Sequence, residues 1–151
     1  MPDIKIQIKN LYKIFGPNHK KMINHVESGM GKAELLEQHA HVLALKDVNI
    51  DVPAKGVQVI MGLSGSGKST LIRHINRLIE PSSGQMLVDG SDVLGMSDSE
   101  LENFRRFKAS MVFQNFALFP HKTILENGMY GLKVQGIKDE QAKPQAQKWL
   151  D

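Results

Sequence analysis

The chain has 151 residues and a mass of 16.9 kDa, about the size of one folded domain. Apolar residues make up 41% and charged residues 23% of it, which excludes a disordered or fibrous chain. The formal net charge of +3 is too small and too scattered to indicate nucleic-acid binding, so we expect no nucleic-acid partner. The absence of cysteine excludes a disulfide framework and favours a cytoplasmic location. We also expect neither a signal peptide nor a membrane span.

The first third of the chain predicts a strand, a helical segment and a second strand. Apolar and polar residues alternate over residues 3–9, which is typical of a half-buried antiparallel strand. A Gly-Pro-Asn turn signal follows directly after Phe15. Residues 20–45 then show helical spacing, with apolar positions that end in Leu43 and Leu45, and a strand is expected over residues 48–52.

The rest of the chain predicts an alternation of strands and helices. Residues 57–61 form a short apolar run bounded by glycines, which is typical of a strand buried on both faces of a parallel sheet. A helix is expected over residues 69–80, and Asp89-Gly90 indicates a hairpin. Further predictions are a charged helix from a capping box at 97–100 to Lys108, a strand at 111–113, and a helical end interrupted by Gly128, Gly131, Gly136 and Pro144.

A phosphate-binding loop stands between the predicted strand at 57–61 and the helix that follows it. Residues 62–69 match G-x-x-x-x-G-K-[ST] in the strand-to-helix context that the motif requires. Gly65 and Gly67 allow the backbone to curl so that its N–H groups point at phosphate oxygens, and the helix adds its positive end. An accidental glycine-rich turn is the alternative. The loop residues assigned to the nucleotide are Gly62, Ser64, Gly65, Ser66, Gly67, Lys68, Ser69 and Thr70.

Four polar side chains receive individual roles at this site. Lys68 is predicted to reach the β- and γ-phosphates, and Ser69 to offer its hydroxyl to Mg²⁺. Thr70 is predicted to meet the α-phosphate. Gln114 ends the apolar run at 111–113, where its carbonyl oxygen could coordinate Mg²⁺ or the attacking water; the alternative is an ordinary loop glutamine.

Four segments together resemble the ATP-binding subunit of ABC transporters of the glycine betaine/proline (quaternary amine) uptake type. They are IKNLYKIFG, GLSGSGKST, NRLIEPSSGQMLVDG and MVFQNFALFPHKTILEN, which look like the A-loop, P-loop, hairpin and Q-loop of that family. The resemblance covers essentially the whole chain and includes an inserted helical segment at 17–45. It implies an α/β fold, with a P-loop NTPase core and an antiparallel β subdomain, truncated at the start of the helical subdomain.

The resemblance also implies cofactors and partners. ATP and Mg²⁺ are the expected cofactors, with Phe15 stacked on adenine and Tyr12 as the competing candidate. Transmembrane permease subunits are expected to contact a loop surface, and a second ATP-binding subunit and a substrate-binding protein complete the expected assembly. It would lie on the inner face of the bacterial plasma membrane and take up osmoprotectants. The residues expected to face the permease are Phe116, Leu118, Phe119 and Pro120.

The chain departs from the family pattern in several ways. It contains no LSGGQ-like signature, no apolar strand followed by Asp-Glu (Walker B) and no switch histidine, so residues 1–151 resemble a partial nucleotide-binding domain. Hydrolysis by these residues alone is therefore not expected, and a non-catalytic nucleotide-binding or interaction module is the alternative function. The segment between Gly56 and Gly62 is one residue shorter than usual, and Asn127-Gly128 replaces a more helix-friendly pair.

Overall fold

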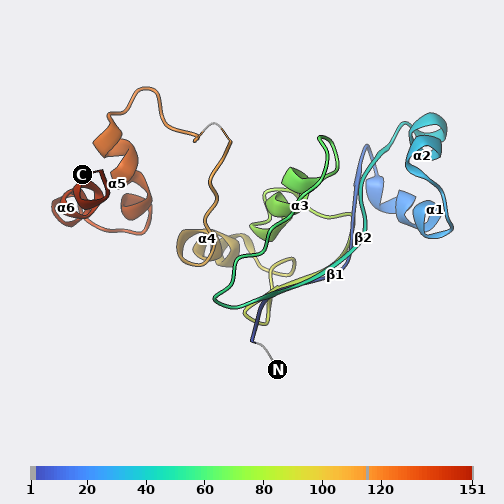
Figure 1. Cartoon of the computed structure of the whole chain (residues 1–151), viewed down its shortest axis with the longest axis horizontal. Helices are drawn as coiled ribbons and strands as arrows, with labels where there is room; N and C mark the ends of the chain where they lie inside the picture. The colour runs from blue at the N-terminus through green and yellow to red at the C-terminus, as the bar shows by residue number, and fades with distance from the viewer. Residues whose placement is uncertain (1–2, 115, 151) are drawn as a thin grey trace. The chain divides into compact units, whose positions relative to one another are not determined.

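The computed structural model describes residues 3–114 and 116–150. The chain divides into two units, Met1–Ser97 and Asp98–Asp151, and each is described by itself (Figure 1). No helix in the described part of the chain is both long and apolar enough to cross a bilayer.

The first unit is built on a four-stranded antiparallel sheet. Its strands are β1 (Ile4–Phe15), β2 (Val42–Pro53), β3 (Ser83–Val88) and β4 (Ser91–Asp92), in the order β2-β1-β3-β4. The antiparallel strand predicted at residues 3–9 is confirmed and continues to Phe15. The hairpin at Asp89-Gly90 is also confirmed, because both residues have positive φ, 49° and 76°, as a two-residue type I′ turn requires.

Short helices join β1 to β2 at one end of the sheet, as Figure 1 shows. They are the 3₁₀ helix η1 (His19–Met22), α1 (Ile23–Glu27) and α2 (Lys32–His39). The helix predicted as far as residue 45 is wrong in its last part. Ala40 adopts a left-handed conformation (φ 55°) and ends α2, and β2 then buries Leu43 and Leu45 on alternate positions. These helices pack on the sheet in a core cluster of Tyr12, Ile14, Ile23, Val26, Leu35 and Leu43.

The segment that precedes the phosphate-binding loop differs from the prediction. Residues 57–61 form no strand. Val57, Val59 and Met61 are 93%, 63% and 87% exposed, and of these five residues only Ile60 packs against the core, in the cluster that contains Leu45 and Leu71. A strand that is buried on both faces needs neighbouring strands to bond its backbone. The sheet formed by the described residues pairs β1 to β4 with one another and gives this segment no partner.

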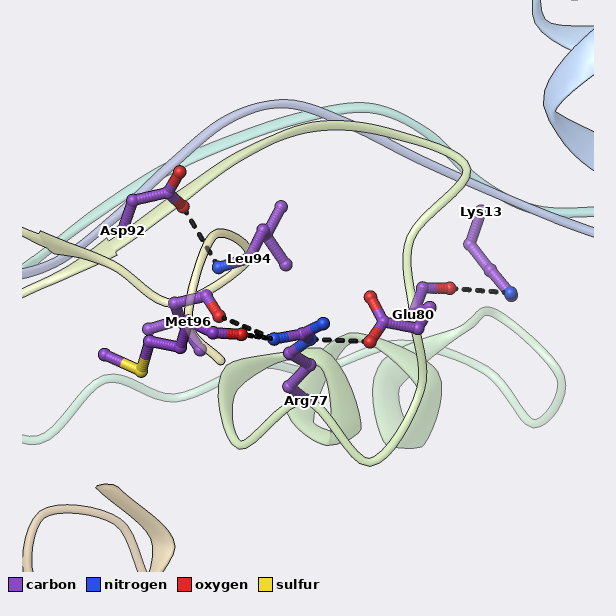
Figure 2. Close-up of polar contacts among 7 residues, drawn as sticks. Lys13, Arg77, Glu80, Asp92, Leu94 and Met96 are labelled. Atoms are coloured by element: carbon purple, nitrogen blue, oxygen red, sulfur yellow. Dashed lines mark hydrogen bonds and ion pairs between the residues drawn. The ribbon is translucent and has the colours of Figure 1, made fainter. Parts of the chain in front are cut away.

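Helix α3 (Lys68–Ile75) is shorter than the helix predicted for residues 69–80. It ends because Arg77 takes a left-handed conformation (φ 51°) and its side chain turns to the chain that follows the hairpin. Arg77 Nη1 donates to the Met96 carbonyl at 2.7 Å, and its Nε pairs with Glu80 (Figure 2). The Glu80 carbonyl in turn accepts a hydrogen bond from Lys13 Nζ at 2.7 Å, which ties the end of α3 to β1.

The second unit contains three helices among the described residues: α4 (Asp98–Phe107), α5 (Ile124–Val134) and α6 (Asp139–Leu150). The charged helix expected up to Lys108 is confirmed as α4. The strand expected at 111–113 is not formed, and Val112 is 86% exposed. Of the expected interruptions, only Gly136 (φ 86°) separates helices. Gly128 and Gly131 lie inside α5, and Pro144 lies inside α6.

Candidate nucleotide-binding site

The glycines of the predicted phosphate-binding loop have the backbone conformations that the motif requires. Gly65 has φ 76° and Gly67 has φ 92°, both in the region that favours glycine. Gly67 also lies against β2, since a Cβ built there would come within 2.7 Å of the Ala44 carbonyl oxygen and 2.9 Å of a Leu45 methyl carbon. The loop is thus packed onto the sheet at Gly67, where α3 begins.

Lys68 folds back over the loop. Its Nζ donates hydrogen bonds to the carbonyl oxygens of Gly62 at 2.8 Å and Leu63 at 2.7 Å, and it lies 3.5 Å from the hydroxyl of Ser66. The ammonium group is therefore held against the start of the loop, and Lys68 itself is the first residue of α3. A compact positive charge beside a helix N-terminus is a suitable environment for phosphate.

A cleft of about 210 Å³ joins this loop to the end of β1. Phe15 is the last residue of β1, pairs with Val42 of β2, and is 40% exposed. Tyr12, the competing candidate for the adenine contact, is instead buried in the core. Lys13 Nζ lies 4.8 Å from the centre of the Phe15 ring, and burial lowers the pKa of Lys13. The cleft is lined by Phe15, Lys32, Val42, Ala44 and residues 65–70.

The hydroxyl of Ser69 fits a magnesium ligand. Ser69 lines the cleft and is exposed, and its hydroxyl makes no hydrogen bond with any other residue of the described chain. Mg²⁺ prefers such oxygen donors and keeps several waters and phosphate oxygens in its coordination sphere. Gln114, the other predicted ligand, is exposed and belongs to the second unit, and its role stays a prediction.

The loop after Gln114 is organised by a residue that sequence reasoning took only for a poor helix former. Asn127 Oδ1 accepts from the Phe119 backbone N–H at 2.8 Å, and its Nδ2 donates to the carbonyls of Phe119, Lys122 and Thr123 at 3.2, 3.2 and 2.9 Å. Phe119 packs on the ring of Tyr130, with ring centres 4.7 Å apart. Among the residues expected to face a permease, Phe116, Leu118 and Pro120 are exposed and Phe119 is half-buried.

His41 is a second residue whose structural role the sequence did not indicate. Its Nε2 lies 2.7 Å from the Pro17 carbonyl and its Nδ1 lies 2.6 Å from the His39 carbonyl. The ring also fills the space beside Gly16, where a Cβ would come within 2.3 Å of it. His41 therefore holds the turn that follows Phe15. No periodic pattern marks such a residue, because its contacts with Gly16 and the Pro17 carbonyl are made to another segment.

This loop, cleft and aromatic residue define a P-loop nucleotide-binding fold, and comparison with known proteins identifies the family. The sequence model of the ABC transporter family matches residues 45–151, and the chain belongs to that family. It is 48% identical to the glycine betaine/proline betaine transport ATP-binding protein ProV of Escherichia coli and 46% identical to the glycine betaine transport ATP-binding protein OpuAA of Bacillus subtilis. Each alignment covers 95% of this chain and 36% or 34% of the relative, so the chain spans about a third of their length.

Solved structures support the same fold. A dimeric post-hydrolysis state of the ATP-binding cassette MJ0796 bound to ADP and Pi has a TM-score of 0.75 and 30% sequence identity. The alignment covers 95% of this chain and 54% of that cassette. The expected fold class is therefore confirmed, although the two buried strands predicted at 57–61 and 111–113 are not formed.

Proposed function

We propose that the chain is the nucleotide-binding part of an ATP-binding subunit of an ABC importer for osmoprotectants of the glycine betaine/proline type. The observation that carries the proposal is the cleft that joins Phe15 to the loop of Lys68, in a sequence 48% identical to a glycine betaine/proline betaine transport ATP-binding protein. In the complete assembly, ATP binding and hydrolysis would couple to solute uptake.

Each end of the cleft suits one part of ATP. The exposed Phe15 ring would stack on adenine, a contact worth roughly 1–3 kcal/mol in related base-stacking cases. The backbone N–H groups of the loop and the Lys68 ammonium would bind the β- and γ-phosphates. The exchange of loop carbonyls for phosphate oxygens at Lys68 Nζ replaces two neutral acceptors with charged ones, which strengthens those hydrogen bonds.

Ser69 would hold Mg²⁺, which neutralises phosphate charge when bound. Gln114 is proposed separately, from the sequence alone, as a further Mg²⁺ ligand. Thr70, the third residue of α3, would orient the α-phosphate from the first turn of that helix. These residues bind and orient the nucleotide. None of them is proposed as the general base that removes a proton from the attacking water.

The exposed side chains of Phe116, Leu118 and Pro120 would contact the transmembrane permease subunits on the cytoplasmic face of the plasma membrane. A second ATP-binding subunit would complete a dimer, and the dimeric form of the cassette MJ0796 supports this arrangement. A substrate-binding protein would act through the permease and would not touch this chain.

A calorimetric titration of the purified chain with MgATP tests the proposal, with Lys68→Ala as the paired variant. Saturable binding that is lost in Lys68→Ala supports nucleotide binding at this loop. No binding by the wild-type chain contradicts the proposal. A parallel assay for released phosphate separates the two functions considered above: binding with turnover supports an ATPase, and binding without turnover supports a non-catalytic nucleotide-binding module.

A further inference from the structure

The inserted segment between β1 and β2 brings one basic side chain to the nucleotide cleft. Lys32 is the first residue of α2 and lines the cleft together with Phe15 and the loop residues 65–70. The sequence alone gives no sign of this, since a lysine at the start of an amphipathic helix is usually a solvated residue.

The position of Lys32 relative to the cleft is fixed by packing. Leu35, one turn further along α2, is fully buried in the core cluster with Ile14 and Leu43. Those two residues directly neighbour Phe15 and Val42, which both line the cleft. Because residues three apart lie on the same side of a helix, the burial of Leu35 turns Lys32 towards the end of the sheet where the cleft opens.

The charges around the cleft favour a polyanion. Its lining contains two lysines, Lys32 and Lys68, and no acidic residue. Lys68 is engaged by the carbonyls of Gly62 and Leu63, whereas Lys32 makes no hydrogen bond or ion pair with any described residue of the chain. The remaining wall near Phe15 is apolar, formed by Val42 and Ala44. An unpaired ammonium beside this site has the nucleotide's phosphates as its chemically matched partner.

We propose that Lys32 is a phosphate-binding residue of the nucleotide site, supplied by the inserted segment in addition to the P-loop. The inference rests on the proposed function, because it assigns a contact to the same ATP. Lys32 reaches the phosphate chain from α2, while Lys68 reaches it from the loop, so the two cations come from separate elements of the first unit.

Titration of the whole chain with MgATP tests this with three variants, Lys32→Ala, Lys32→Arg and Lys21→Ala. Lys21 is an exposed lysine of the same inserted segment that does not line the cleft. We expect Lys32→Ala to raise the Kd for ATP by roughly 3- to 10-fold, the range for one charged contact in a solvated site. Lys32→Arg keeps the charge and should stay within about 2-fold of wild type, and Lys21→Ala should bind like wild type. Raising the salt concentration should weaken wild-type binding more than binding by Lys32→Ala.

Adenosine, followed by ligand-observed NMR, separates a phosphate contact from any other. Lys32→Ala should leave adenosine binding unchanged. An equal loss for adenosine and ATP would overturn the phosphate assignment, and wild-type affinity for ATP in Lys32→Ala would overturn the whole inference. If wild-type chain and Lys32→Ala both fail to bind ATP, the proposed function itself falls; if only Lys68→Ala fails, the proposed function stands and the role of Lys32 does not.

Discussion

Two glycines of the loop allow the cost of a left-handed backbone to be separated from the cost of a steric clash. Gly65 and Gly67 both have positive φ, but an added Cβ at Gly65 meets nothing within 4 Å, whereas at Gly67 it meets the Ala44 carbonyl at 2.7 Å. Left-handed alanine costs about 1–2 kcal/mol, and overpacking adds about 1–3 kcal/mol. We therefore expect Gly65→Ala to lower the free energy of unfolding by about 1–2 kcal/mol and Gly67→Ala by about 2–5 kcal/mol.

Urea denaturation followed by circular dichroism measures both free energies, and calorimetry with MgATP measures the loop itself. Gly67→Ala should displace the loop from β2 or shift the strand, because the clash is with a backbone atom that cannot rotate away. Its loss of stability should be larger than that of Gly65→Ala by about 1–3 kcal/mol. Equal losses for the two variants would refute the reasoning, since they would mean that Gly67 does not lie against β2.

Two further predictions concern other parts of the chain. Gly128→Ala and Gly131→Ala should each raise the stability of α5 by about 0.5–1 kcal/mol, measured by hydrogen exchange of its amides, because neither glycine has a positive φ and an added Cβ meets nothing closer than 3.6 Å; faster exchange would contradict this. Burial lowers the pKa of His74 below its usual 6.5, so the unfolded chain takes up a proton there before the folded chain does. Above about pH 6.5 the protonation of His74 should therefore not affect the free energy of unfolding, and below that pH it should lower this free energy. His74→Leu should flatten the fall, as measured by urea denaturation at several pH values; an unchanged pH dependence in the variant would contradict the prediction.

The elements that the sequence predicted well are those fixed by local interactions. The turn at Asp89-Gly90 needs only two residues that tolerate positive φ, and the strand before Phe15 is marked by its own alternation of apolar and polar residues, although its partner strands are distant in the chain. The phosphate-binding loop is likewise specified by its own glycines and by the helix that follows. For Phe15 and residues 65–70, the sequence therefore named part of the lining of the cleft before any tertiary contact was known.

The features that the sequence did not predict depend on contacts between segments that the fold brings together. Lys32, His41 and Asn127 act through atoms of other segments: a cleft, the Pro17 carbonyl and the backbone around Phe119. The boundary between α2 and β2 was missed because Leu43 and Leu45 suit either a helix or a strand when their neighbours are unknown. Burial by the core cluster decides between the two, and burial is a property of the fold.

The wrong strand prediction at residues 57–61 bears directly on how the loop is held in place. Residues 57–61 form no strand and all but Ile60 are exposed, so this segment gives the loop that follows it little support. The loop is held instead from its other end, by the contact of Gly67 with β2 and by Leu71 of α3, which is buried against Leu45 and Met86. The cleft therefore requires the antiparallel sheet and α3, and does not require the apolar run to be a strand. ATP binding by this chain, lost in Gly67→Ala and kept when Val57 and Val59 are replaced by threonine, is the result that this argument predicts.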